Sequence, residues 1–222
     1  SIPIFMQDWW MDAVCAGKCW DVLLCYDSNG QIGAAMPYLL RRRVGQSYIV
    51  MPQMTQIGGL WIRTDLQQDS AQVQTICQNI AQQLQALDLA YYYQQFPIHS
   101  SAVEELSQQG FSIQERVTYR IEDVNDMDAL VATFSKNKKR QLQKAQTLHA
   151  DLTLNPEDFY RFHVQCLQQQ GKQINYVREF LLVLERKTTR LNCGQIIAIR
   201  NAEDELLAAA YVVWDAHSMY YL

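Results

Sequence analysis

No apolar stretch in the sequence approaches the ~18 consecutive residues that a helix needs to span a bilayer. The first residues, SIPIFMQDWW, lack the basic start and the apolar core of a signal peptide. They also lack an initiator methionine. We therefore expect no membrane span, a cytoplasmic location and a trimmed amino-terminal end.

Motifs for common metal and nucleotide sites are missing as well. The cysteines include no CxxC pair, and neither they nor the histidines show metal-ligand spacing. There is no Walker loop and no glycine-rich dinucleotide turn. We expect no metal and no tightly bound cofactor. We interpret the cysteines as reduced thiols and the histidines as structural (Cys15, Cys19, Cys25, Cys77, Cys166, Cys193; His99, His149, His163, His217).

Positive charge is also scarce, because 19 Lys and Arg face 23 Asp and Glu, for a net charge of -4. An isoelectric point near 5.5 argues against a protein that coats nucleic acid with its whole surface. Because the chain as a whole is acidic, any anion site must be local.

The 222 residues suit one large domain or two small ones, and 49% hydrophobic residues indicate a globular fold.

One basic run stands out against this background, FSKNKKRQLQKAQ from Phe134 to Gln146. Five of the 19 cationic residues lie between Lys136 and Lys144, and no carboxylate occurs between Asp128 and Asp151. We expect a helix capped by Ser135, with an inward face (Leu142, Ala145 and Leu148).

Cations in the first turn of such a helix oppose the helix dipole, at a cost of roughly 0.3–1 kcal/mol each. A bound phosphate would relieve this conflict, since free backbone N–H groups point at the same place. Arg140 is the best candidate for a phosphate contact, because a guanidinium binds two oxygens at once. Lys144, Lys139 and Lys138 follow. The alternative is a solvated basic face. Arg41 to Arg43 are a weaker candidate, because alternating outward residues at a strand end explain them without a function.

Periodicity predicts alternating strands and helices. A helical pattern covers residues 3–15, and two strands within 20–40 flank the turn Asp27 to Gly30. A third strand covers 47–51, and a connection with two glycines leads to a helix over 73–87, for which Ser70 is the predicted N-cap. A strand over 89–96, a helix over 99–109 and a strand over 111–121 follow. This order predicts an α/β fold, a mixed central sheet with helices on both faces.

The pattern then restarts. Residues 155–172 form a capped amphipathic pattern, and 194–214 again read strand, turn, strand. At a constant offset of 174, Val22 meets Ile196 and Ile32 meets Leu206. We interpret this as an internal duplication: a first unit over 1–125, a basic junction helix over 126–150, and part of a second unit over 151–222. Either the natural protein continues beyond Leu222, or the half-unit packs against the first.

The element order resembles the GNAT acyltransferase fold, and a tandem pair of such units resembles its FemAB-like branch. The specific matches are QIGGLWI at 56–62, the Gly110-Phe111 step, and the basic segment, in which Arg140 is followed four residues later by Lys144-Ala145. The coenzyme-A loop of ordinary GNAT enzymes, Arg/Gln-x-x-Gly-x-Gly/Ala, is absent.

This resemblance implies N-acyl transfer from acyl-CoA (such as acetyl-CoA) or aminoacyl-tRNA to an amine, by direct attack without a covalent intermediate. It implies a bacterial cytoplasmic enzyme, and the acceptor stays open between a cell-wall precursor, a small amine and a protein lysine. A phosphate held between the two units would explain the basic helix.

Other residues of the first unit are candidates on weaker grounds. Gly58 and Gly59 allow a close backbone approach to a ligand, or simply form a turn. Tyr92 and Tyr93 lie where a GNAT sheet splays to admit substrate, although such a run is more often sheet core and surface. No general base stands out; Asp65 and Asp69 are only nearby carboxylates.

Two other interpretations of the chain compete with the acyltransferase. A non-catalytic module would dock RNA, another polyanion or a partner protein through residues 136–144, with affinity that falls steeply with salt. A degenerate GNAT fragment would only scaffold another protein. The oligomeric state is open in all three.

Overall fold

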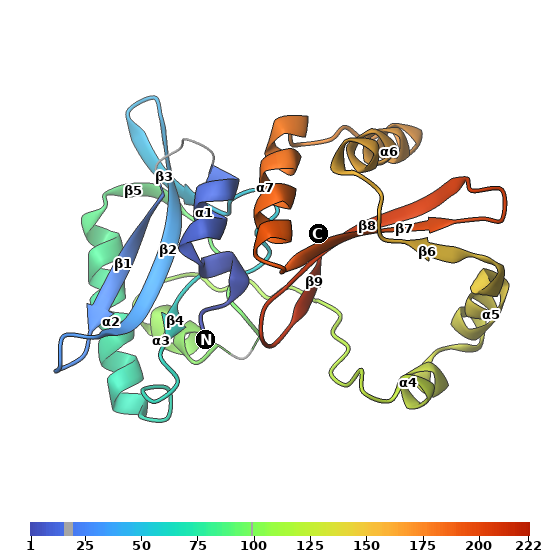
Figure 1. The fold of residues 1–222 in the computed structure, drawn as a ribbon. Coiled ribbons are helices and arrows are strands. Elements are labelled where there is room, and N and C mark those ends of the chain that lie inside the picture. Colours follow the sequence, from blue (N-terminus) through green and yellow to red (C-terminus); the bar gives the residue numbers. More distant parts are fainter. Residues whose placement is uncertain (16–19, 99) are drawn as a thin grey trace.

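The computed structural model describes residues 1–15, 20–98 and 100–222 (Figure 1). Two separate β-sheets lie side by side, each with its own helices, and a long extended segment joins them (Figure 1). Cys19 and His99 fall outside the described residues, so the roles expected for them are not addressed. The coarse prediction of a mixed α/β fold is confirmed.

The first sheet has the strand order β1-β2-β3-β5, with the short β4 paired to β2. Its strands run antiparallel except β3 and β5, which are parallel. The predicted hairpin turn is confirmed, and Gly30 supplies the positive φ of 75°. The elements of this half are η1 (Ile4–Met6), α1 (Asp8–Cys15), β1 (Trp20–Tyr26), β2 (Ile32–Arg43), β3 (Gln46–Val50), β4 (Trp61–Ile62), α2 (Ser70–Ala86), β5 (Leu89–Tyr92) and α3 (Ala102–Gln108).

Helix α2 covers one face of this sheet, as its apolar spacing predicted. Its cap differs from the prediction, because Asp69 rather than Ser70 is the N-cap: the Asp69 carboxylate accepts hydrogen bonds from the backbone N–H groups of Ala71 and Gln72. The two neighbours are both good caps, and the carboxylate also suits the positive end of the helix dipole. The core beneath α2 and α3 is apolar (Leu23, Cys25, Ala34, Met36, Tyr38, Ile49, Val73, Cys77, Ile80, Leu84).

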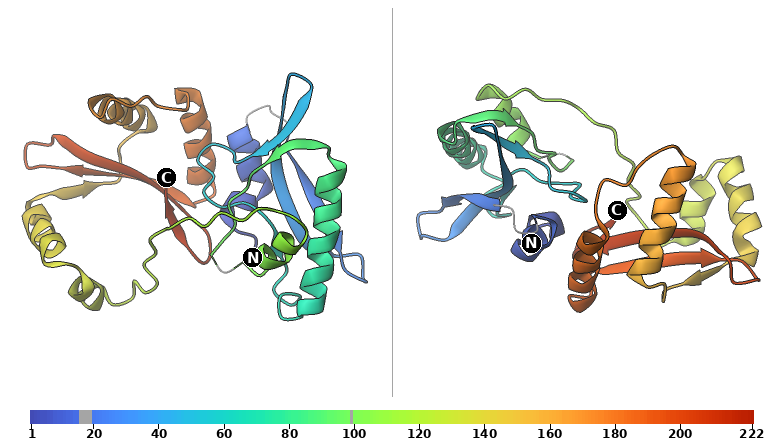
Figure 2. Two further views of the ribbon diagram at one scale, coloured as in Figure 1. Left: turned by 180° about the vertical axis from the view of Figure 1, so that it is seen from behind. Right: turned by 90° about the horizontal axis from the view of Figure 1, so that it is seen from above.

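The strand predicted over 111–121 is wrong. Residues 111–124 form no regular element, and Val117 and Tyr119 are 90% and 97% exposed. The alternating pattern is present, but this segment crosses from the first sheet toward α4 and finds no strand to pair with (Figures 1 and 2). A strand needs such a neighbour for its backbone hydrogen bonds.

The second sheet has the order β6-β7-β8-β9, with every pairing antiparallel. Asn155 caps α6, which confirms the helix predicted there. The elements are α4 (Met127–Thr133), α5 (Lys136–Lys144), η2 (Ala145–Thr147), β6 (His149–Asp151), α6 (Pro156–Gln169), α7 (Arg178–Arg190), β7 (Gly194–Arg200), β8 (Leu206–Trp214) and β9 (Met219–Tyr221).

The two hairpins match residue for residue. The bounds of β7 equal those of β1 plus 174, and the cross-strand partners follow the same shift: Trp20 pairs with Leu39 as Gly194 pairs with Val213. The register irregularity falls at corresponding places, and Asp27 and Asn201 accept equivalent turn hydrogen bonds. Helix α7, which the sequence analysis missed, overlaps α1 at the same offset. The boundaries proposed for the two units remain a prediction.

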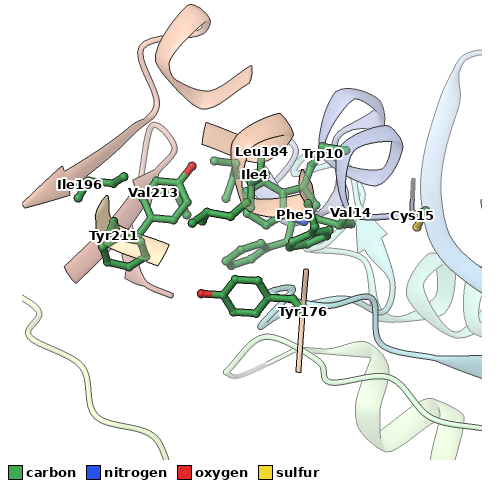
Figure 3. Close-up of a cluster of buried hydrophobic side chains, with 14 of the residues drawn as sticks. Ile4, Phe5, Trp10, Val14, Cys15, Tyr176, Leu184, Ile196, Tyr211 and Val213 are labelled. Atoms are coloured by element: carbon green, nitrogen blue, oxygen red, sulfur yellow. The ribbon is translucent and has the colours of Figure 1, made fainter. Parts of the chain in front are cut away.

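A common core joins the two halves. Helix α1 packs against α7, and the residues of η1 and α1 share one buried cluster with residues of the second sheet (Figure 3). Trp10 and Phe5 contact each other edge to face, with ring centroids 4.9 Å apart. This confirms that the second part of the chain packs against the first. The cluster includes Ile4, Val14, Leu39, Phe159, Tyr176, Phe180, Leu181, Leu184, Ile196, Tyr211 and Val213.

Candidate functional site

The basic run forms helix α5 where the sequence placed it. The Ser135 hydroxyl accepts a hydrogen bond from the Lys138 backbone N–H at 3.4 Å, so the predicted cap is confirmed. The predicted inward face is wrong for two of its three residues: Leu142 is 45% exposed and Ala145 is exposed, and only Leu148, beyond the end of α5, is partly buried. The helix therefore lies on the surface, and none of its residues is fully buried.

Of the cationic side chains of α5, Lys139 has an internal role. Its Nζ atom donates a hydrogen bond to the carbonyl oxygen of Ala132 at 2.7 Å, which ties α5 to the end of α4. In the described part of the chain, no group forms an ion pair or hydrogen bond with the side chains of Lys136, Lys138, Arg140 or Lys144. Lys136, Asn137 and Arg140 line a surface depression of about 290 Å³. These groups can receive an anion without first breaking a contact.

The position of α5 corrects one expectation. Helices α4 and α5 lie at the far end of the second sheet, beyond β6 and away from the first sheet (Figures 1 and 2). A phosphate bound to Arg140 would thus not be held between the two halves. The sequence placed α5 between them along the chain, but the extended segment 111–124 carries it past the second sheet.

Gly58 and Gly59 have packing roles in the structure. The Gly58 N–H donates to the Gln95 carbonyl oxygen at 2.7 Å. Gly59 has φ of 83°, and a Cβ atom there would lie 2.8 Å from the ring of Phe96. Both glycines are buried. They allow a close approach between two stretches of the chain, the one that follows β3 and the one that follows β5.

The tyrosines at the end of β5 differ from each other. Tyr92 is half-buried, its ring packs on Phe111, and burial raises the pKa of its hydroxyl. The Tyr93 hydroxyl instead accepts a hydrogen bond from Arg116 Nη1 at 2.9 Å, and the Gln95 amide lies 2.7 Å from it. With the Gln95 amide oxygen toward Tyr93 and Arg116, its nitrogen donates to the Gln56 carbonyl oxygen at 2.8 Å.

We refer to Gln56, Tyr93, Gln95 and Arg116 as the polar cluster. It lies at the carboxyl ends of the parallel strands β3 and β5, the edge at which open α/β sheets commonly bind ligands. The Gln56 side chain also donates to the carbonyl oxygen of Tyr221 in the second sheet. The cluster thus lies where the two halves meet.

Sequence reasoning found Tyr93 but missed the other members of the polar cluster. Arg116 lies in the segment that was predicted to be a strand, and no local signal marks it. Gln56 and Gln95, which follow the strands, are not distinctive either, because this chain is rich in glutamine. The structure joins Gly58, Gly59, Tyr92 and Tyr93 in one region and leaves the α5 cations in another.

The carboxylates noted as nearby have structural partners. Arg63 bridges Asp27 and Asp65 at 2.8 and 2.7 Å, and its hydrogen bonds lower the pKa of both carboxyl groups. Asp69 caps α2. Neither Asp65 nor Asp69 is therefore poised as a general base.

Three described cysteines and one histidine also have structural surroundings. Burial raises the pKa of Cys25, Cys77 (to about 11) and Cys193, which keeps these thiols protonated near neutral pH. His163 Nδ1 lies 2.7 Å from the hydroxyl of Tyr176. The described residues contain no group of three or more His, Cys, Asp or Glu that could hold a metal ion, and no described helix is both long and apolar enough to span a membrane.

Comparison with known proteins gives a similarity of fold. No protein-family model and no curated protein matches the chain. The chain is similar to the crystal structure of FemX, with a TM-score of 0.61 at 8% sequence identity, over 89% of this chain and 52% of FemX. The chain thus has a FemX-like fold and spans about half the length of FemX.

Proposed function

We propose that the chain is part of a transferase that passes an acyl or aminoacyl group from a phosphate-bearing donor to an amine. Two features support this: the FemX-like fold, and a surface helix with five cations in a chain of net charge -4. The cations of α5 carry the proposal, since four of them have no partner among the described residues. We assign phosphate contacts to Arg140, Lys144, Lys136 and Lys138.

The separation of helix α5 from the polar cluster favours a donor linked to tRNA over one linked to coenzyme A. Helix α5 lies beyond the far end of the second sheet, whereas the polar cluster at the carboxyl end of β5 lies where the two halves meet (Figure 1). A donor that contacts both must extend past the second sheet, and RNA does so more readily than a single coenzyme. The cost of placing cations in the first turn of α5 is also repaid best by several phosphates.

The acceptor amine belongs at the polar cluster in this proposal. The Tyr93 hydroxyl, held by Arg116 and Gln95, offers an oxygen that an amine N–H can bind. Positioning of this kind supplies much of the rate of a direct acyl transfer. The protonated state of Cys25, Cys77 and Cys193 supports attack without a thioester on these residues, because the thiolate is the nucleophilic form.

One observation favours a second function. Helix α5 has no fully buried residue and lies far from the polar cluster, so it suits a module that only docks RNA. That module would bind charged and uncharged tRNA equally and would transfer nothing. The two functions therefore differ in their response to the acyl group.

A transfer assay tests the proposal. Residues 1–222 are incubated with aminoacyl-tRNA and an amine acceptor, and loss of the aminoacyl group is followed with uncharged tRNA or acetyl-CoA as competitor. The proposal predicts acceptor-dependent loss that uncharged tRNA inhibits and Arg140→Met weakens. Binding without any transfer supports the docking module instead. Inhibition by acetyl-CoA alone points to a coenzyme-linked donor.

A further inference from the structure

The turn between β2 and β3 holds an apolar residue in a strained conformation. Val44 and Gly45 form the two-residue connection, and both have a positive φ, of 50° and 77°. Glycine adopts such angles freely, but for a β-branched residue they are an outlier, and Asn, Asp or Gly is the usual choice at this place in a hairpin. The Val44 side chain is 94% exposed, so no packing inside the described chain offsets the strain.

Three consecutive arginines precede this turn. Arg41 and Arg43 point to one face of the hairpin and Arg42 to the other, because side chains alternate along a strand. All three are exposed, and in the described part of the chain they form no ion pair and no side-chain hydrogen bond. Alternation turns one face outward, so it explains Arg42 or its two neighbours but not the whole run. The turn therefore carries positive charge on both faces.

The tip of the hairpin stands clear of the molecule. It projects past helices α1 and α2 (Figures 1 and 2). Neither β2 nor β3 contains Asp or Glu. Asp88 precedes Leu89, the partner of Ser47, and makes no ion pair with the arginines. The three cations lie within about 10 Å of Val44 along the strand, a distance comparable to the Debye length in physiological salt.

An apolar point flanked by arginines fits the surface of an anionic bilayer better than it fits RNA. When the tip meets a bilayer end-on, Val44 enters the boundary between head groups and acyl chains, and arginines on both faces reach lipid phosphates. A row of RNA phosphates would meet the cations of one face and would gain nothing from burying Val44. The net charge of -4 opposes a broader contact with an anionic surface, which leaves the tip as the point of approach.

We propose that the β2–β3 tip, residues 41–45, docks onto an anionic lipid bilayer. Val44 is the inserting residue, and the three arginines bind lipid phosphates. The contact is peripheral and reversible, because each cation near such a surface strengthens binding by only about fivefold. The strained valine is retained because the contact needs an apolar side chain at this place. This inference does not depend on transferase activity.

Sedimentation with vesicles tests the charge of the tip. Residues 1–222 are mixed with vesicles of phosphatidylcholine alone, or of phosphatidylcholine and phosphatidylglycerol in equal amounts. We expect binding to the anionic vesicles only, weakened by salt and by about fivefold in Arg42→Gln. Arg190→Gln is the matched control, since Arg190 is exposed in the last turn of α7, and it should bind like the parent.

Val44→Asn separates insertion from charge. Asn tolerates the positive φ that strains Val44, so this variant should unfold at a higher temperature than the parent. Its binding to anionic vesicles should nevertheless fall by about threefold or more, because the apolar side chain is lost. Val44→Leu keeps an apolar side chain and should bind at least as tightly as the parent. A purely structural role of Val44 would move stability and leave vesicle binding unchanged.

The other outcomes overturn the proposal. Absence of binding to anionic vesicles contradicts it, and so does an equal loss in Arg42→Gln and Arg190→Gln, which would make net charge the cause. Parent-like vesicle binding by Val44→Asn would remove insertion from the account. Binding of tRNA that Arg42→Gln weakens, without any vesicle binding, would make RNA the occupant of the tip.

Discussion

The ammonium group of Lys139 lies 2.7 Å from the carbonyl oxygen of Ala132, so one cation of the basic helix holds α5 against α4. The carbonyl belongs to the last turn of α4, where the helix dipole favours a positive charge. Arg140, the next residue, has no such contact in the described chain and lines the depression with Lys136 and Asn137. Two adjacent cations thus have different roles.

Substitution of Lys139 and of Arg140, one at a time, separates these two roles. Arg140→Met should weaken tRNA binding and lower the salt slope by about one, as expected when one phosphate contact is lost. Lys139→Met should mainly speed amide hydrogen exchange in α4 and α5, because it frees the two helices from each other. Equal effects of the two substitutions on the salt slope would contradict the assignment.

Acid should weaken the second sheet through Asp151. Hydrogen bonds from Thr153 and from Arg200 lower the pKa of this carboxyl to about 2. Its contribution to the free energy of unfolding is therefore complete above the unfolded pKa near ~4 and is lost as pH falls toward 2. Urea unfolding of Asp151→Asn should depend less on pH over this range than that of the parent.

Asp204→Asn is the control for this experiment. The Asp204 side chain is 78% exposed and lies 3.7 Å from Arg200, so it touches the same arginine without being enclosed. Its replacement should leave the pH dependence of unfolding between pH 4 and 2 close to that of the parent. If both variants flatten the curve equally, the network around Asp151 is not its cause.

The hydroxyl of Tyr93 should matter more than that of Tyr92. Tyr93→Phe removes the acceptor for Arg116, and we expect about a 3- to 10-fold loss of transfer rate, the range for one hydrogen bond. Tyr92→Phe loses only a 3.2 Å contact with Gln94 and should keep the parent rate. Steady-state rates, with circular dichroism to check folding, compare the two. Identical losses would place the acceptor elsewhere.

The buried thiols should be dispensable for chemistry. Cys25→Ala, Cys77→Ala and Cys193→Ala should each keep the transfer rate per folded molecule. In the native protein, iodoacetamide should alkylate Cys77 slowly at pH 7.5, because its pKa is raised to about 11. Loss of activity in a folded alanine variant would contradict direct attack by the amine.

Local signals carried most of what could be predicted from the sequence. The turn at Asp27 to Gly30, the stripe of α2 and the cap at Ser135 each depend on neighbours within a few residues, and each appears in the structure. The register of the second hairpin followed from the repeat at 174. Helix α7 was missed although Phe180, Leu181 and Leu184 lie on one helical face.

Predictions that depend on distant partners failed or stayed open. The alternation over 111–121 favoured a strand, but pairing needs a free edge nearby. Leu142 has helical spacing for burial, yet it stays 45% exposed, because no described element covers its side of α5. The polar cluster joins Gln56, Tyr93 and Arg116 across long sequence separations, and no local pattern records such a contact.

Calorimetric titration with tRNA tests the central claim most directly, that α5 binds a phosphate-bearing donor. Residues 1–222, Arg140→Met and the charge-matched control Arg42→Met are titrated at low and moderate salt, with acetyl-CoA in parallel. The account predicts saturable tRNA binding that Arg140→Met weakens and Arg42→Met does not. Saturable, salt-tolerant binding of acetyl-CoA with no heat from tRNA, or equal loss in both variants, would contradict it.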